Sequence, residues 1–164
     1  MRLLFLDIDG VLNNDIWYQS EAFKQLETPY SHFDPRCVAS LNQLIKKTNA
    51  AIVISSTWRN KYALADLKTL FTAIGAQVNI IGATPQLKKE HLALLRGNEI
   101  MQWCKDNEHI IGCSWRDYHD YAILDDNSDM LFWQKDNFFQ TDRYVGLTPS
   151  VKRNIERFFA SKSI

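Results

Sequence analysis

Cysteine is scarce in this sequence, which has three such residues: Cys37, Cys104 and Cys113. The number is odd, and no two of them form a Cys-x-x-Cys pair. This pattern argues against both a disulfide framework and a zinc knuckle. We therefore expect the protein to work in a reducing compartment.

Long apolar runs are also missing. No stretch approaches the roughly 18 apolar residues that a membrane-spanning helix needs, and Ala50 to Ile54 is followed at once by Ser-Ser-Thr. The apolar run Leu3 to Leu6 leads into Asp7 and Asp9, where an export signal would continue with apolar residues. We interpret that run as a buried strand, and we expect a cytoplasmic protein without a membrane partner.

A third absence is net charge, because 19 Lys and Arg residues balance 19 Asp and Glu residues. No overall field draws the molecule to nucleic acid or to an acidic membrane, so selectivity for charged partners must be local. Apolar residues make up 46% of the 164 residues and charged residues 23%, as is normal for a globular protein. We expect one domain over residues 1–164, and nothing indicates an obligate protein partner.

Short apolar runs alternate with amphipathic segments along the chain. The expected strands are Leu3 to Leu6, Ala51 to Ile54, Val78 to Ile81, Tyr121 to Leu124 and a short Phe138 to Gln140. The expected helices run from Asp34-Pro35 to near Asn49, from Leu64 to Gly75, from Asn98 to Asp106, and onward from Thr148-Pro149. Loops are expected at Asn13 to Phe33, Gly82 to Leu95 and His109 to His119. The alternation predicts an α/β fold with a Rossmann-like, doubly wound parallel sheet and no folded cap domain.

Acidic residues follow the first and fourth expected strands. Asp7 and Asp9 come after the first strand, and Asp125 and Asp126 come after the fourth. The carboxyl ends of parallel strands meet at one edge of the sheet, where α/β proteins bind their ligands. Carboxylates gathered there repel one another unless a hard cation lies among them, and Mg²⁺ suits such ligands. The sequence thus predicts a magnesium site at Asp7, Asp9, Asp125 and Asp126.

The same acids suit a phosphoryl transfer. A carboxylate such as Asp7 can attack phosphorus to form an aspartyl-phosphate. A second acid, Asp9, can protonate the leaving oxygen and then activate water. Asp7 is therefore the candidate nucleophile, and Asp9 is the candidate general acid and base.

Hydroxyl and basic residues complete the candidate site. Ser55 follows the second strand and, with Ser56 beside it, is a candidate donor to a phosphoryl oxygen. The transition state also needs a fixed cation. The candidates for that cation are Arg59, Lys61, Lys88, Lys89 and Arg96. Position in the sequence does not choose among them.

Several segments together resemble the haloacid dehalogenase (HAD) superfamily. Asp7-Ile8-Asp9-Gly10-Val11-Leu12-Asn13 resembles its first motif, Ser55 its second and Asp125-Asp126 its fourth. Ser55-Ser56-Thr57-Trp58-Arg59, Arg96-Gly97-Asn98-Glu99-Ile100 and Gly146-Leu147-Thr148 extend the likeness to the HAD domain of Swiss Army Knife RNA repair proteins. The resemblance implies a HAD fold, Mg²⁺, an aspartyl-phosphate and the trimming of RNA phosphate ends. The sequence has no isolated lysine that matches the third motif of the superfamily, and Arg96 is the candidate substitute for that lysine.

Three functions stay open on the sequence. The first is a phosphomonoesterase acting on nucleic-acid ends or nucleotides, and the second is a small-metabolite phosphatase. The third is a phosphate-binding or phosphoacceptor module that does not turn over. Aromatic residues between Trp17 and Phe33, and between Trp115 and Tyr121, offer surfaces for stacking bases, although core packing explains them more simply.

Overall fold

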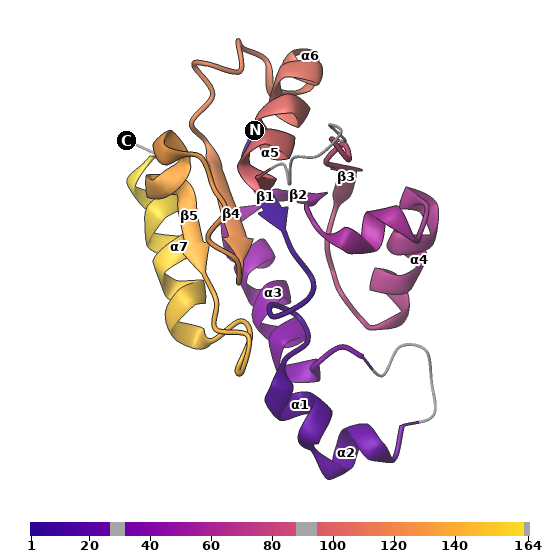
Figure 1. Ribbon diagram of the computed structural model, residues 1–164. Coiled ribbons are helices and arrows are strands. Elements are labelled where there is room, and N and C mark those ends of the chain that lie inside the picture. The colour runs from indigo at the N-terminus through magenta and orange to yellow at the C-terminus, as the bar shows by residue number, and fades with distance from the viewer. Residues whose placement is uncertain (27–31, 88–94, 163–164) are drawn as a thin grey trace.

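The computed structural model of the chain describes residues 1–26, 32–87 and 95–162. Its centre is a five-stranded parallel sheet in the order β3-β2-β1-β4-β5 (Figure 1). The strands are β1 (Leu3–Leu6), β2 (Ala51–Ile54), β3 (Ile80–Ala83), β4 (Tyr121–Asp125) and β5 (Phe138–Gln140). The predicted α/β fold with a parallel sheet is confirmed.

Helices cover both faces of this sheet. The longer helices are α3 (Pro35–Thr48), α4 (Leu64–Ala73), α5 (Arg96–Asp106) and α7 (Pro149–Ser161). The shorter ones are α1 (Asp15–Gln19), α2 (Glu21–Lys24), α6 (Glu108–Ile111) and the 3₁₀ helices η1 (Thr57–Asn60) and η2 (Phe132–Asn137). None of the helices in these described ranges is long and apolar enough to cross a membrane.

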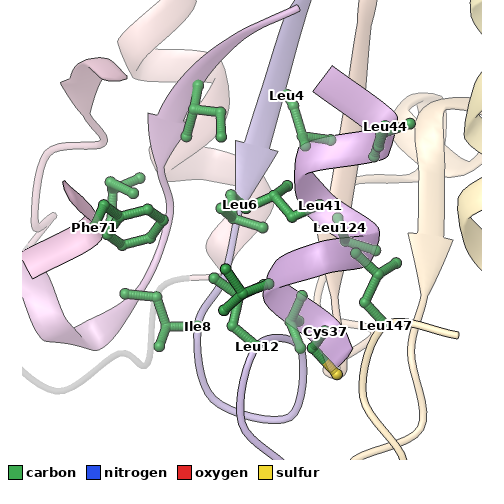
Figure 2. Close-up of a cluster of buried hydrophobic side chains, with 14 of the residues drawn as sticks. Leu4, Leu6, Ile8, Leu12, Cys37, Leu41, Leu44, Phe71, Leu124 and Leu147 are labelled. Atoms are coloured by element: carbon green, nitrogen blue, oxygen red, sulfur yellow. The ribbon is translucent and has the colours of Figure 1, made fainter. Parts of the chain in front are cut away.

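The core lies in two layers because successive strand residues point to opposite faces of the sheet. Leu4 and Leu6 pack with α3, α4 and α7, and Figure 2 shows this layer with Leu41 and Phe71. Leu3 and Phe5 pack with α5 and α6 on the other face. All four residues of β1 are fully buried, which explains why the strand reads as one continuous apolar run.

Helices α3 and α7 begin at the caps that the sequence predicts. Asp34 caps α3 by accepting a hydrogen bond from Arg36 N at 2.9 Å, and Asn49 ends that helix in the left-handed conformation. Thr148 caps α7 through Val151 N. These caps satisfy backbone groups that a helix leaves unpaired at its ends.

Two predicted boundaries are wrong for reasons of tertiary packing. β3 covers Ile80–Ala83 rather than Val78 to Ile81, because it continues through Gly82, where a Cβ would lie 3.0 Å from Trp103 Nε1 of α5. Helix α5 starts at Arg96 rather than Asn98, because Asp129 Oδ2 accepts a hydrogen bond from Arg96 N at 3.0 Å. Both signals come from residues distant in the sequence.

Two segments expected to be loops contain short helices. The segment from Asn13 to Phe33 forms α1 and α2, which Asn14 and Ser20 cap through their side chains. The segment from His109 to His119 begins inside α6. Helices of four or five residues are too short for a periodic apolar pattern to indicate them. The rest of these expected loops, where described, lies outside named helices and strands.

The strand order creates one natural binding edge. The chain runs from β1 outward to β2 and β3, then crosses to β4 on the other side of β1. Ligands of open α/β sheets bind at the carboxyl ends of the strands where the order reverses. In this molecule that point lies between β1 and β4, whose arrowheads in Figure 1 point toward the side on which α1 and α2 lie.

Candidate active site

Strand register brings three polar residues into one row at this edge. Leu6 pairs with Leu124 of β4 on one side and with the last residue of β2 on the other. The next residues, Asp7, Asp125 and Ser55, therefore lie beside one another. Hydrogen bonds from Asp7 N to Leu124 O at 3.0 Å and from Ser55 N to Leu6 O at 2.8 Å continue the ladder.

Asp7, Asp125 and Asp126 form a compact acidic cluster. One carboxylate oxygen from each lies within 4.8 Å of the other two. Asp7 and Asp125 are buried and Asp126 is half-buried. Asp125 Oδ2 accepts no hydrogen bond within the described part of the chain. A buried carboxylate oxygen of this kind fits a hard cation such as Mg²⁺, which these three side chains would hold.

The electrostatics of the cluster agree with that fit. Burial raises the pKa of Asp7 to about 6 and the pKa of Asp125 to about 8, and the Asp7 carboxylate contributes to the second shift. Arg96 opposes both shifts, and a hydrogen bond from Ser56 opposes the one at Asp7. Burial also raises the pKa of Asp126. Carboxylates in this environment gain from any positive charge placed among them.

Asp9 lies outside this cluster, although the sequence predicts it as a fourth ligand. Its exposed carboxylate accepts hydrogen bonds from Trp58 Nε1 at 3.1 Å to each oxygen and from Asn13 Nδ2 at 2.8 Å. Asn13 Oδ1 in turn accepts Gly10 N at 2.9 Å, which ties the side chain to the turn. An exposed carboxylate held in one orientation is better suited to exchange protons than a carboxylate buried beside three other acids.

The turn after β1 requires glycine at position 10. Gly10 has a φ of 70°, a conformation that other residues adopt only with strain. A Cβ at this position would overlap the carboxylate of Asp126. The Gly10 carbonyl also accepts a hydrogen bond from the Thr141 hydroxyl at 2.8 Å. The turn therefore packs directly against Asp126, which follows β4, and against Thr141, which follows β5, and it brings the two acidic motifs together.

The two serines after β2 are fully buried. Ser56 Oγ accepts a hydrogen bond from Trp58 N at 3.4 Å and donates to Asp7. Ser55 Oγ has no partner among the described residues. Ser56 thus supports the candidate nucleophile, and Ser55 offers an uncommitted hydroxyl in the same row.

Arg96 and Arg59 have different surroundings. Arg96 Nε lies 3.5 Å from Asp125 Oδ2, and Asp129 fixes the backbone of Arg96. Arg59 forms a buried ion pair with Glu99 and also donates to Ser56 O. Arg96 therefore lies against the acidic cluster, whereas Glu99 already neutralises Arg59.

Two cavities open at this edge and share Asp9 and Thr57. The acidic cavity, of about 400 Å³, is lined by Asp7, Asp9, Tyr18, Arg96, Asp126 and Arg143, with several smaller residues. The aromatic cavity, of about 670 Å³, includes His32, Trp58, Lys61, Tyr62 and Asp66 in its lining. Asp9 stands at the junction of the two.

Several residues of the site carry no signal in the sequence. Tyr18 and Arg143 line the acidic cavity from α1 and from the turn before α7, and neither belongs to a recognisable motif. Trp58 and Glu99 lie inside segments that resemble the HAD pattern, but their partners are visible only in three dimensions.

Of the predicted candidate lysines, Lys61 lies in the aromatic cavity. Lys88 and Lys89 fall outside the described residues.

The parallel sheet and its acidic carboxyl edge define a HAD-type domain, as the motifs predict. Residues 3–151 match the family described as the HAD domain in Swiss Army Knife RNA repair proteins. The chain belongs to this family. Comparisons with curated proteins and with solved structures give no match.

Proposed function

We propose that this domain is a magnesium-dependent phosphomonoesterase that acts on nucleic-acid ends or nucleotides through an aspartyl-phosphate. The observation that carries the proposal is the acidic cluster of Asp7, Asp125 and Asp126 beside Arg96. Membership of a HAD family described from RNA repair proteins supports the reaction class and the choice of substrate.

In the first step, an Asp7 carboxylate oxygen attacks the phosphorus atom. The bond between phosphorus and the leaving oxygen breaks, and its electron pair stays with that oxygen. Asp9, in its protonated form, donates its proton to the leaving oxygen, so that an alcohol departs. Trp58 and Asn13 orient the Asp9 carboxylate for this transfer through their hydrogen bonds.

In the second step, Asp9 accepts a proton from water. The water oxygen attacks phosphorus and displaces the Asp7 carboxylate, which releases inorganic phosphate and restores both aspartates. The exposure of Asp9 supports this role, because water must reach it. The acid of the first step thus becomes the base of the second.

Positive charge must offset repulsion between the phosphate and the aspartates. Bound Mg²⁺, held by Asp7, Asp125 and Asp126, would neutralise phosphoryl oxygens and position the phosphate. Arg96 is the fixed protein cation in this proposal, with Ser55 as a donor to a phosphoryl oxygen. Ser56 and Arg59 remain predicted phosphate ligands, and their present partners also give them supporting roles: Ser56 donates to Asp7, and Arg59 pairs with Glu99 in the first turn of α5.

The direct test measures phosphate release from sugar phosphates, nucleotides and oligonucleotides phosphorylated at the 3′ or 5′ end. The wild type should release phosphate with Mg²⁺ and lose this activity with a chelator. Asp7→Asn should lower kcat by about 10⁴-fold or more, because it removes the nucleophile.

Asp117→Asn is the matched control, since it makes the same chemical change at an exposed acid away from both cavities. It should keep wild-type activity. Preference for sugar phosphates over nucleotides and oligonucleotides would favour a metabolite phosphatase. The proposal would be contradicted if the wild type bound Mg²⁺ but released phosphate from none of the substrates.

A further inference from the structure

Asp9 lines both cavities, so different parts of a substrate bound at Asp9 would lie in different cavities. In the proposed reaction the phosphoryl group lies beside Asp7, in the acidic cavity, and the leaving oxygen lies at Asp9. The rest of the leaving group must extend away from Asp7. The aromatic cavity begins at Asp9 and Thr57 and provides about 670 Å³ for it, within the range of roughly 300–1,000 Å³ found for small-molecule sites.

Aromatic rings line that second cavity. The Trp58 and Tyr62 rings lie 5.6 Å apart between centroids at an interplanar angle of 34°. Phe33, which is buried, packs edge-on against Trp58 with centroids 5.3 Å apart. Tyr62 remains 45% exposed. The pair therefore forms an aromatic platform, composed of Trp58 and Tyr62, that reaches from Asp9 toward solvent.

Polar residues also line the aromatic cavity, among them His32, Thr57 and Thr69, and the charged ones are of both signs. Lys61 supplies a cation that can pair with a further phosphate, and Asp66 supplies an acceptor for N–H groups. A flat, uncharged group with N–H donors, connected to phosphate through a sugar, matches this arrangement. A bare ribose would cover less of the aromatic surface than a base covers, and a single phenyl ring would fill little of the volume.

We propose that the aromatic cavity binds the terminal nucleotide of the substrate, with its base stacked on the platform of Trp58 and Tyr62. This inference rests on the proposed function and assigns the leaving-group site within it. It identifies the substrate as a phosphate monoester of a base-bearing nucleoside, free or at a strand end. Stacking makes recognition tolerant of base identity, because every base offers a π face.

The test compares Tyr62→Ala with wild type on substrates that differ only in the terminal base. One pair is adenosine 5′-monophosphate and ribose 5-phosphate. Further pairs are 3′- or 5′-phosphorylated oligonucleotides with an intact or an abasic terminal nucleotide. Tyr62→Ala should lower the ratio of kcat/KM between base-bearing and base-free members by about 5- to 100-fold. Tyr62→Phe, which keeps a ring, should restore most of that ratio.

Phe132→Ala is the control, because Phe132 is 79% exposed and lies outside both cavities. It should leave the ratio unchanged. Equal losses on both members of a pair, or no loss, would overturn the inference while leaving the phosphatase proposal intact. A Tyr62→Ala loss confined to a phosphotyrosine peptide in the same assay would also overturn it.

A binding measurement separates this inference from the reaction itself. Calorimetry with the Asp7→Asn variant and adenosine 5′-monophosphate requires no turnover. Tyr62→Ala in that background should weaken binding of the nucleotide by a similar factor and affect ribose 5-phosphate less. This result would support the base site even if the wild type released no phosphate. Unchanged nucleotide affinity would refute it.

Discussion

The acidic cavity and the aromatic cavity meet at Asp9 but are built by different forces. Hydrogen-bond register between β1, β2 and β4 creates the acidic cavity, because it aligns residues at the strand ends. Ring packing between η1 and the residues just before α3 creates the aromatic cavity. The first holds charge against the cost of burial, and the second exposes apolar surface to water. Chemistry can therefore be altered at Asp7, which lines only the acidic cavity, and recognition at Tyr62, which lines only the aromatic cavity.

The two aspartates of the first motif illustrate the same contrast. Asp7 is buried and its pKa is raised, whereas Asp9, two residues later, is exposed and held by hydrogen bonds. A nucleophile shielded from water and a proton carrier open to water need these opposite surroundings. The turn at Gly10 allows one short segment to supply both.

The largest effect expected after loss of Asp7 concerns the fixed cation of the acidic cavity. Arg96→Gln should lower kcat by about 10²- to 10³-fold, because the transition state loses a preorganised charge. Arg59→Gln should instead lower the free energy of unfolding by about 3–5 kcal/mol, because Glu99 would be buried without its partner. Kinetics and chemical denaturation of both variants measure the difference. A large loss of kcat in Arg59→Gln at unchanged stability would reverse the assignment.

A smaller effect is expected at the boundary between the cavities. Trp58→Phe removes the indole N–H that bonds to Asp9 but keeps an aromatic ring. We expect kcat to fall by about 10-fold on base-bearing and base-free substrates alike, as for loss of a hydrogen bond to a charged group. Trp133→Phe, at a residue 60% exposed outside both cavities, is the control. A change in KM alone would mean that Trp58 acts in binding only.

The smallest effect concerns metal, pH and stability. The raised pKa values of Asp7 and Asp125 mean that the folded chain binds protons more tightly than the unfolded chain. Without metal, these groups therefore lower stability as the pH rises from about 4 to 8. Mg²⁺ competes with those protons, so its stabilising effect should grow over the same interval.

Thermal unfolding with and without Mg²⁺ measures this linkage. At pH 8 and 100 times the Kd, Tm should rise by about 5–10 °C, and at pH 5 by much less. Asp125→Asn should remove most of the gain at pH 8, and Asp117→Asn should leave it intact. An equal gain at both pH values would show that the cation binds away from the raised carboxyls.

Features set by local pattern could be predicted from the sequence. Buried strands are continuous apolar runs, and the caps at Asp34 and Thr148 are local side-chain contacts. Because parallel strands end at a common edge, their positions also predicted that Asp7 and Asp125 would meet. In the structure, the register of β1 and β4 brings a carboxylate oxygen of Asp7 within 4.8 Å of one of Asp125.

Features set by contacts across the sheet could not be predicted in this way. The start of α5 depends on Asp129, which lies after β4, and the course of β3 depends on Trp103 packing on Gly82. Similarly, the position of Arg59 soon after Ser55 predicts a phosphate ligand but does not predict its partner in the fold. Its ion pair with Glu99 joins η1 to α5, and no spacing within the sequence indicates it.

The position of Asp9 between the two cavities also sets the order in which products leave. While the alcohol product occupies the aromatic cavity next to Asp9, its oxygen holds the place that water must take. Water can enter only after that product has departed, and phosphate forms only after water has entered. In the proposed cycle the alcohol is therefore released first and phosphate last. Added phosphate should then bind the same free form of the protein that the next substrate binds.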